Sequence, residues 1–459
     1  MLNKIYMAYL RSHHVTTDSR QITPGCIFFA LKGDHFDGNM FVPQALEQGA
    51  AQCVTSDPHY GNDQRCVVVD DVLHTLQELA SLHRSYMTIP VVGITGTNGK
   101  TTTKELVTAV LSKRYRTSST TGNHNNHLGV PLTLLAIPAN SEMAVVEMGA
   151  NHPGEIADLC NIADPDCGLI TNVGVAHIEG FGSLEGVVQT KTELYRHLAA
   201  KHGYVFVDAD NKRLMDEAEI LATIPSTESL VPAYAPASPI LSEEALRETP
   251  LGIVTYGNTA EADVRGTVID AEGEPFLHFY FEVGDNVYTV HTHLLGNYNF
   301  ANCMAAVAVG LHFGVEPFAI KEAIEAYQPQ NQRSQYRESA RGNRLYLDCY
   351  NANPSSMAAA IDSFRSMGGD VAIVGSMKEL GCESRKEHLK LIDMLKNTGL
   401  TQVMVIGSEF DSIAMPDNMR HFATTDEVAA ELSSHPLSNH TILVKGSNSN
   451  RLWTLEEYL

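Results

Sequence analysis

The residues best suited to do chemistry lie in the stretch 91–106, which reads VVGITGTNGKTTTKEL. Gly93, Gly96 and Gly99 allow a tight backbone bend that brings amide groups against phosphate oxygens at the start of a helix. Lys100 would neutralise charge on the terminal phosphates, and the Thr101 hydroxyl would sit where Mg²⁺ is bound. A turn that merely joins a strand to a helix needs no Lys-Thr pair. The stretch therefore predicts a phosphate-binding loop for a nucleoside triphosphate, although its spacing from Gly93 to Gly99 differs by one residue from that of the general loop.

Apolar, strand-like segments separated by helical patterns follow this loop. They read MAVVEMG at 143–149, GLITNVG at 168–174 and YVFVDAD at 204–210. Such short continuous apolar segments predict a parallel sheet covered on both faces. Ligands bind beyond the carboxyl ends of strands in these sheets. Glu147, Asn151, Asn172 and His177 come at those ends and are therefore candidate site residues.

Length and charge limit the class of protein. A chain of 459 residues is long for one core, so we expect three domains. The net charge of -22 and the lack of a basic stripe argue against a nucleic-acid partner. The eight cysteines show no C-x-x-C or zinc spacing, so we expect free thiols in a reducing cytoplasm. No apolar run approaches the length of a membrane span, which predicts a soluble, cytoplasmic protein.

Two regions flank the central one. Residues 1–87 alternate short apolar runs (26–33, 66–71) with helical patterns (42–48, 73–85), which predicts a small α/β domain. Residues 330–459 hold four further apolar segments, at 345–350, 370–376, 402–408 and 441–447. These predict a Rossmann-like third domain. It has no G-x-G-x-x-G, so a nicotinamide cofactor is not supported.

The central domain, 88–329, contains two features that interrupt its alternation. Pro90 precedes a new buried strand and marks the boundary with the first domain. A Pro/Ser/Glu-rich stretch at 224–249 is expected to be a surface excursion. After it, FLHFYFEV (276–283) and NVYTVHTHL (286–294) alternate as the strands of a hairpin do, with Gly284 and Asp285 as the turn.

Six blocks, taken together, resemble the Mur ligase family. They lie at 18–38, 93–103, 122–135, 147–156, 176–183 and 348–357 and span most of the chain. EMGANHPGEI, AHIEGFGS and YNANPSSM are most similar to the members that add D-alanyl-D-alanine to UDP-N-acetylmuramoyl-tripeptide. The resemblance implies a uridine-nucleotide domain, an ATPase domain and a closing Rossmann-like domain. It also implies that ATP phosphorylates the tripeptide carboxylate, and that the amine of the dipeptide attacks the resulting acyl phosphate.

The resemblance assigns nucleotide, metal and catalytic roles. Lys100, Glu147, His177 and Lys191 would be catalytic, and Thr101, Glu147, His177 and Lys191 would hold Mg²⁺, with Lys191 as a carbamate. By residue type alone, His177 is more often structural and Lys191 a solvated helix lysine, and Mg²⁺ prefers oxygen ligands to imidazole. The resemblance implies that ATP is bound by Gly96, Thr97, Asn98, Gly99, Lys100, Thr101, Thr102, Asn302, Arg333 and Asp348.

Further positions correspond to the substrate sites of the family. Ser19, Arg20 and the loop starting at Gly33 would bind the uridine nucleotide. The muramoyl peptide and the acceptor would meet Asn125, Asn126, Thr133, Asn351, Asn353 and Lys445. On residue types alone, Asn351 and Asn353 beside Pro354 predict a turn and a helix cap. The resemblance also implies a monomer.

Three other activities compete with this interpretation. The preceding ligase of the pathway shares the ATPase core, but the Asn-Pro-Arg motif of many such enzymes reads Asn353-Pro354-Ser355 here. A folate polyglutamate ligase would lack the DSR block at 18–20. A nucleotide-dependent switch has less need of a second Mg²⁺ at an acceptor carboxylate. The third residue of the tripeptide, lysine or diaminopimelate, stays open.

Overall fold

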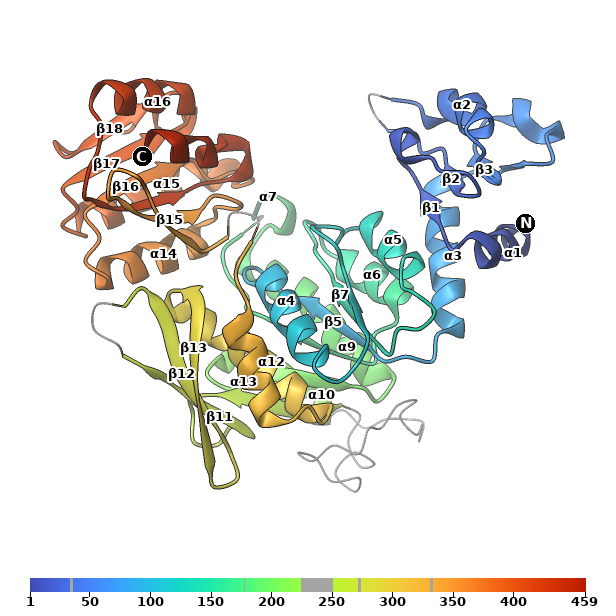
Figure 1. The fold of residues 1–459 in the computed structure, drawn as a ribbon, viewed down its shortest axis with the longest axis horizontal. Helices are drawn as coiled ribbons and strands as arrows, with labels where there is room; N and C mark the ends of the chain where they lie inside the picture. Colours follow the sequence, from blue (N-terminus) through green and yellow to red (C-terminus); the bar gives the residue numbers. More distant parts are fainter. Residues whose placement is uncertain (34–35, 177, 224–250, 271–273, 331–332) are drawn as a thin grey trace.

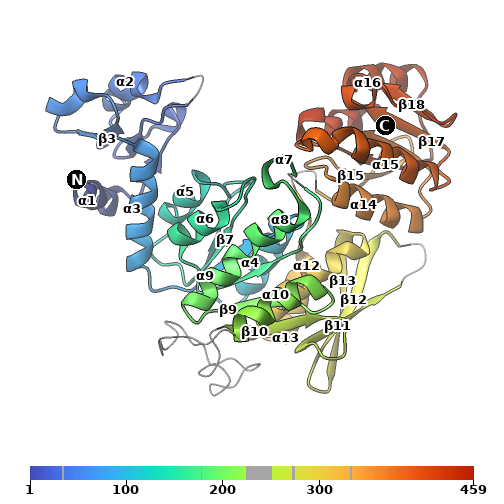
Figure 2. The same ribbon diagram turned by 180° about the vertical axis from the view of Figure 1, so that it is seen from behind.

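The structure, a computed structural model, describes residues 1–33, 36–176, 178–223, 251–270, 274–330 and 333–459. Three sheets follow one another along the chain, within 15–68, 91–295 and 335–445. Figures 1 and 2 show the first and third sheets on opposite sides of the central one. The expected α/β organisation in three sheet domains is confirmed. The stretch predicted as a surface excursion, 224–249, lies outside the described residues.

The first domain is a four-stranded parallel sheet, in the order β1-β2-β3-β4, with helices around it. Its elements are α1 (Leu2–Ser12), β1 (Val15–Thr16), β2 (Ile27–Phe29), α2 (Val42–Glu47), β3 (Gln52–Thr55), β4 (Cys66–Val68) and α3 (Val72–Tyr86). The two predicted helices are thus present as α2 and α3. Helix α1 was not predicted, although Ile5 and Tyr9, four residues apart, form its buried face.

The central sheet has nine strands in the order β13-β12-β11-β10-β9-β8-β5-β7-β6. Its strands are β5 (Val91–Thr95), β6 (Thr117–Ser119), β7 (Met143–Glu147), β8 (Cys167–Ile170), β9 (Tyr204–Asp208), β10 (Gly252–Gly257), β11 (Val264–Ile269), β12 (Phe276–Val283) and β13 (Asn286–Leu295). Strands β6 to β11 run parallel, whereas β12 and β13 are antiparallel. The predicted hairpin is confirmed, because Val283 pairs with Asn286 across the turn.

Helices cover both faces of this sheet. They are α4 (Lys100–Leu111), α5 (Gly129–Leu135), α6 (Glu155–Ala163), α7 (Ile178–Phe181), α8 (Leu184–Lys191), α9 (Glu193–Ala200), α10 (Lys212–Thr223), α12 (Phe300–His312) and α13 (Pro317–Ala326). Alternate residues of β5 enter different cores: Val91 packs in the core of α5, α6 and α9, and Val92 in that of α4 and α12. Two buried faces explain why the strand reads as a continuous apolar run.

The third sheet has the order β14-β15-β19-β16-β17-β18, with β14 as an antiparallel edge strand. Its elements are β14 (Gln335–Glu338), β15 (Arg344–Asp348), α14 (Pro354–Ser366), β16 (Val371–Gly375), α15 (Ser384–Lys396), β17 (Gln402–Ile406), β18 (Met419–Phe422), α16 (Thr425–Ser434) and β19 (Thr441–Lys445). The four predicted strands are present as β15, β16, β17 and β19. The edge strands β14 and β18 were not predicted, since both are short and carry charged residues.

Helix α3 joins the first domain to the second (Figure 1). One apolar core runs through both domains and contains Leu76 of α3 and Ile156 of α6. At the end of α3 the buried Arg84 side chain donates to the carbonyl oxygens of Ala163 and Asp164 and to Asp166 Oδ2, at 2.8–3.0 Å. The end of α3 is therefore fixed to the central domain. Within the described residues, no helix is both long and apolar enough to cross a bilayer.

Candidate active site

A cavity of about 1500 Å³ opens at the carboxyl edge of the central sheet, and residues of all three domains line it. The position agrees with the rule that parallel sheets bind ligands beyond the carboxyl ends of their strands. The predicted residues that line it are Thr97, Asn98, Gly99, Lys100, Thr101, Thr102, Asn125, Asn126, Glu147, Asn151, Asn172, Asn302, Arg333, Asp348, Asn351 and Lys445. The fold thus brings together side chains from three separate parts of the sequence.

The predicted phosphate loop is the turn between β5 and α4. Gly96 and Gly99 have φ values of 144° and 78°, in the region that favours glycine. A Cβ atom on Gly96 would lie 2.0 Å from Thr171 Oγ1, so a larger residue is excluded there. The turn directs the free amide groups at the N-terminus of α4 into the cavity, an arrangement that binds phosphate.

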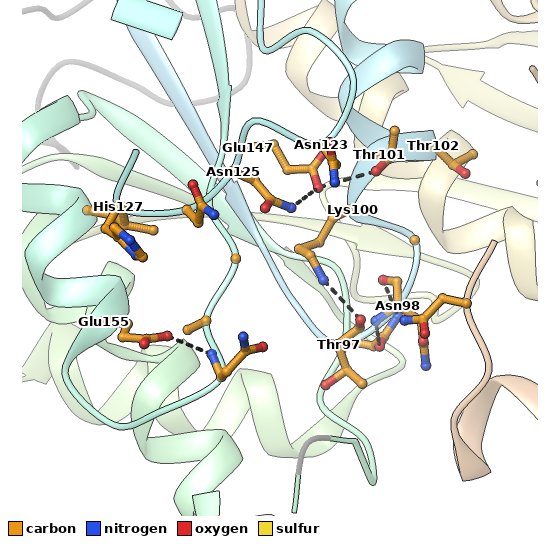
Figure 3. Close-up of a pocket in the computed structure, with 18 of the residues that line it drawn as sticks. Thr97, Asn98, Lys100, Thr101, Thr102, Asn123, Asn125, His127, Glu147 and Glu155 are labelled. Carbon is orange, nitrogen blue, oxygen red and sulfur yellow. Dashed lines mark hydrogen bonds between the residues drawn. The ribbon is translucent and has the colours of Figure 1, made fainter. Parts of the chain in front are cut away.

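Lys100 is the first residue of α4, and its ammonium group donates to the carbonyl oxygens of Gly96 and Thr97 at 2.8 and 3.0 Å (Figure 3). Burial lowers the pKa of Lys100, Glu147 raises it in part, and Arg333 lowers it. The lysine therefore lies inside the loop at the point where phosphate charge would need a cation.

Asn98, at the tip of the loop, is fixed by the end of β8. Its backbone N–H donates to Asn172 Oδ1 at 3.0 Å. Its backbone carbonyl oxygen accepts from Asn172 Nδ2 at 3.0 Å and from the Thr171 hydroxyl. Asn172 was expected near the site from its place after a strand. Thr171 was not, and the signal for it is the same: it follows β8 directly.

Glu147 ends β7 and is 1% exposed. Its Oε1 accepts from Thr101 Oγ1 at 3.2 Å and from Asn125 Nδ2 at 2.8 Å, as Figure 3 shows. Its Oε2 is buried with no hydrogen-bond partner among the described residues. A buried carboxylate oxygen without a donor is costly unless a cation balances it. Together with the Thr101 hydroxyl, this oxygen offers the hard donors that Mg²⁺ prefers, so the residues fit that ion.

Lys191 ends α8 and is buried, 3% exposed. Its Nζ lies 3.4 Å from the carbonyl oxygen of Ala150 and 5.4 Å from the centre of the Phe181 ring. Burial, and to a lesser extent the charge of Lys100, lower its pKa to about 7, against the opposing effect of Glu155 and Glu193. The side chain is thus not the solvated lysine that its residue type alone suggests.

Two ion contacts organise the part of the cavity formed by the third domain. The Arg333 guanidinium stacks on the Tyr350 ring, 3.7 Å from its centre. Lys445 is 1% exposed and forms an ion pair with Asp348. Its ammonium group also donates to the carbonyl oxygen of Asn351 at 3.3 Å. Predicted ATP and substrate residues therefore contact each other directly in this domain.

Asn302 packs under the phosphate loop. Its Nδ2 donates to Asn299 Oδ1 at 2.9 Å, and its Oδ1 accepts from Thr103 Oγ1 at 3.0 Å. A Cβ atom on Gly99 would lie 2.6 Å from Asn302 Oδ1. The asparagine thus supports the loop and lines the cavity at once.

Some predicted residues lie elsewhere. Ser19, Arg20 and Gly33 lie on the first sheet domain, outside the described lining of the cavity, and Arg20 forms a bidentate pair with Asp18 at 2.8–2.9 Å. Thr133 is buried in α5 and donates to the carbonyl oxygen of His124 at 3.5 Å. Three others are also absent from the described lining: Gly96 in the loop itself, Lys191 at the end of α8, and Asn353, the cap of α14. His177 lies outside the described residues.

One wall of the cavity was not predicted. It is formed by α3 of the first domain, through His74, Gln77, Glu78 and Ser81. These polar residues recur every three or four positions, opposite the buried face of the helix that contains Leu76. The polar stripe is the sequence signal that would have identified this wall.

Comparisons with known proteins agree with this geometry. Residues 11–84, 94–223 and 332–448 match the family models "Mur ligase family, catalytic domain", "Mur ligase middle domain" and "Mur ligase, glutamate ligase domain". The chain is 34% identical to the UDP-N-acetylmuramoyl-tripeptide--D-alanyl-D-alanine ligase of Escherichia coli, over 95% of this chain and 91% of that protein. For the Bacillus subtilis protein of the same name, the values are 31%, 96% and 91%. Among solved structures, the MurF ligase of Thermotoga maritima in complex with ADP matches with a TM-score of 0.81 and 27% identity, over 98% of this chain and 97% of that one.

Proposed function

We propose, from the premise that this chain belongs to the Mur ligase family, that it joins D-alanyl-D-alanine to UDP-N-acetylmuramoyl-tripeptide in an ATP-dependent reaction. The observation that carries the proposal is the pairing of Thr101 with Glu147 beside the phosphate loop, in a cavity that all three domains line. The names of the relatives support the choice of substrates. The product would be the UDP-N-acetylmuramoyl-pentapeptide precursor of peptidoglycan.

The reaction would proceed in two steps. An oxygen of the tripeptide's terminal carboxylate attacks the γ-phosphorus of ATP, the bond to the bridging oxygen breaks, and ADP leaves. The amine of D-alanyl-D-alanine then attacks the acyl carbon, phosphate leaves, and the amine loses a proton. The activation is needed because a carboxylate is a poor electrophile, and cations must offset the charge of two anionic reactants.

The chain's own residues would bind and orient the nucleotide. The amide groups at the start of α4 and the Lys100 ammonium would hold the β- and γ-phosphates, next to Thr97, Asn98 and Thr102. Arg333 and Asp348 would approach the nucleotide from the third domain, and Asn302 would support the loop from below. Thr101 and Glu147 would hold Mg²⁺, which would neutralise phosphate charge during transfer.

We propose in addition that Lys191 is carbamylated and forms part of a second Mg²⁺ site with His177 and Glu147. The burial of Lys191 supports this, because a buried amine is neutral more often and only the neutral amine reacts with CO₂. Carbamylation turns the ammonium group into an anion with two oxygens. Those oxygens would supply the hard ligands that Mg²⁺ prefers, and His177 stays a prediction.

Other expectations stay as proposals. For the peptide substrates we propose Asn125, Asn126, Asn351 and Lys445, which line the cavity. Thr133 and Asn353, predicted for the same role, are not among the lining residues, so we propose that they affect the substrate only through their neighbours. The uridine nucleotide would bind at Ser19, Arg20 and Gly33. We propose domain boundaries at 87/88 and 329/330, a monomer, and a cytoplasmic location.

The test measures phosphate release from ATP with Mg²⁺ and UDP-N-acetylmuramoyl-tripeptide, with D-alanyl-D-alanine or with single amino acids. Both forms of the tripeptide, ending in lysine or in diaminopimelate, are supplied. The expected result is phosphate release that requires D-alanyl-D-alanine, with a pentapeptide product by mass spectrometry. A parallel assay supplies UDP-N-acetylmuramoyl-dipeptide, the substrate of the preceding ligase, with lysine or diaminopimelate. If phosphate release requires these instead, the protein is the preceding ligase.

A further inference from the structure

Hydrogen bonds at two places hold the third domain against the phosphate loop and the segment after β8. Asn353 Nδ2 donates to Asn98 Oδ1 at 2.8 Å, and Asn98 Nδ2 donates back to Asn353 Oδ1 at 3.5 Å. The Val175 amide donates to Ser355 Oγ at 2.9 Å. Asn353 and Ser355 belong to the start of α14, whereas Asn98 and Val175 belong to the central domain. The third domain is thus fixed to the loop that would hold the phosphates.

The central-domain side of this contact is rigid. The Asn98 backbone is held by Asn172 through both its amide and its carbonyl group, each at 3.0 Å. Its side chain does not bond these groups and reaches across to Asn353. Asn98 therefore links the end of β8 to the start of α14. A shift of the phosphate loop would move the residue to which α14 is hydrogen-bonded.

The third-domain side is equally well defined. Asn353 is the N-cap of α14: its Oδ1 accepts from the Ser356 amide at 2.9 Å, which leaves its Nδ2 for Asn98. One amide side chain thus fixes the start of a helix and the contact between two domains. Close packing adds to this, because a Cβ atom on Gly174 would lie 2.6 Å from Ser355 Oγ.

We propose that the Asn98–Asn353 amide pair is a positioning contact that sets where Arg333, Asp348 and Lys445 stand relative to the phosphate loop. The proposal rests on the proposed function, in which these three cavity residues bind ATP and the substrate. Asn353 then works through Asn98, without touching the reacting atoms. Loss of the pair would lower kcat, because the third domain would be held less well. Nucleotide affinity would change little, because the loop itself binds the phosphates.

Asn353→Ser tests this with little disturbance of the helix. Serine is as good an N-cap as asparagine but is too short to reach Asn98. We expect kcat to fall at least tenfold and the Kd for ADP, measured by titration calorimetry, to stay within about twofold. Thr424→Ala is the matched control, because it removes an N-cap of α16 in the same domain, and Thr424 is not among the described residues that line the cavity. Its kcat should stay within about twofold of the wild-type value.

A double-mutant cycle with Asn98→Ser identifies the pair itself. If the two side chains act as one contact, Asn98→Ser/Asn353→Ser should be no slower than the worse single variant by more than about twofold. Independent effects, which multiply, would overturn the proposal, as would an unchanged kcat in Asn353→Ser. Should Asn353→Ser fail to fold, Gly174→Ala replaces it: the added methyl group would push Ser355 away from the central domain, with the same expected loss of kcat.

Small-angle X-ray scattering separates this proposal from the proposed function. The radius of gyration of Asn353→Ser should exceed that of the wild type and of Thr424→Ala, since the third domain gains freedom. This readout does not depend on any substrate. A wild-type protein that does not ligate would refute the proposed function alone, whereas equal radii of gyration for the wild type and Asn353→Ser would refute the positioning contact.

Discussion

Thr101 Oγ1 lies 3.2 Å from Glu147 Oε1, although the two residues are far apart in the sequence and belong to α4 and β7. The contact joins the end of the phosphate loop to the neighbouring strand of the parallel sheet. It orients one carboxylate oxygen and leaves the other, Oε2, buried and without a hydrogen-bond donor among the described residues. The arrangement leaves a negative charge that needs a cation, next to the place where phosphates would bind.

Glu147→Gln should abolish most activity while the fold persists. Glutamine keeps an oxygen for Thr101 and Asn125 but has no charge to hold Mg²⁺. We expect kcat to fall by about a hundredfold or more, the size found when a key electrostatic group is removed. The half-saturating Mg²⁺ concentration in the phosphate-release assay should rise as well. An unchanged Mg²⁺ dependence would show that Glu147 does not hold the metal.

Lys100→Ala should abolish turnover and leave the protein folded. The ammonium group donates to the loop carbonyls of Gly96 and Thr97 and to no apolar core element, so its loss should leave the described cores intact. The measurement is ATP turnover, with circular dichroism as the check of the fold. Lys113→Ala is a suitable control, because the Lys113 side chain pairs with Glu322 near the surface and such pairs contribute little. Ligation at the wild-type rate by Lys100→Ala would contradict the assignment of the phosphate loop.

Much of the fold could be predicted because the patterns are local. The loop at 96–101 and strands such as β5 and β7 carry strong residue-type signals, namely glycines with a Lys-Thr pair and continuous apolar runs. The edge strand β14 (Gln335–Glu338) could not be recognised, because it is short and polar and takes its conformation from pairing with β15. Strands β10 and β11, which extend the parallel sheet beyond β9, were also missed. Their burial depends on α12, which is distant in the sequence.

The candidate site was predictable in its centre and less so at its rim. Residues at strand ends, such as Glu147, follow from topology alone. The wall formed by α3 appears in the sequence only as a polar stripe on a helix, and its place at the cavity depends on the packing of α3 on α5 and α6. The contact of Asn353 with Asn98 is likewise tertiary. From its residue type Asn353 predicts a helix cap, which the structure confirms, and nothing in the sequence identifies its second partner.

Activity should depend on bicarbonate and on pH through Lys191. Burial and the charge of Lys100 lower the pKa of this amine to about 7, so the neutral form that reacts with CO₂ predominates only above that pH. We therefore expect added bicarbonate to raise the ligation rate more at pH 8 than at pH 6. Intact-protein mass spectrometry of wild-type protein should show one added CO₂, which Lys191→Met should lack. A rate independent of bicarbonate in CO₂-depleted buffer would contradict carbamylation.

The lowered pKa of Lys191 also makes the stability of the unmodified protein depend on pH. The folded pKa of Lys191 is lower than the unfolded value of about 10.4, so between pH 7 and that value the unfolded state binds more protons. The free energy of unfolding should then rise with pH by up to about 1.4 kcal/mol per unit from this group. Urea titrations without metal and CO₂ should show the rise in wild type and a smaller one in Lys191→Met.

Arg84 should be important for the stability of the junction between the first two domains. Its buried guanidinium donates to two carbonyl oxygens and to Asp166, and Asp166 in turn accepts from the Val91 amide at the start of β5. Arg84→Met keeps the apolar length of the side chain but leaves these acceptors without a donor. We expect a loss of about 3 kcal/mol in the free energy of unfolding, as for other buried pairs that lose one partner.

Arg65→Met provides the comparison, because Arg65 is about half exposed and pairs with Asp63 at 3.3 Å on the surface. Removal of this pair should cost less than about 1 kcal/mol. Urea denaturation of both variants, followed by circular dichroism, measures the difference. Since α3 also forms a wall of the cavity, Arg84→Met should raise the KM for the uridine substrate more than the Kd for ADP. Equal stability losses in the two variants would mean that the Arg84 contacts do not fix the domain junction.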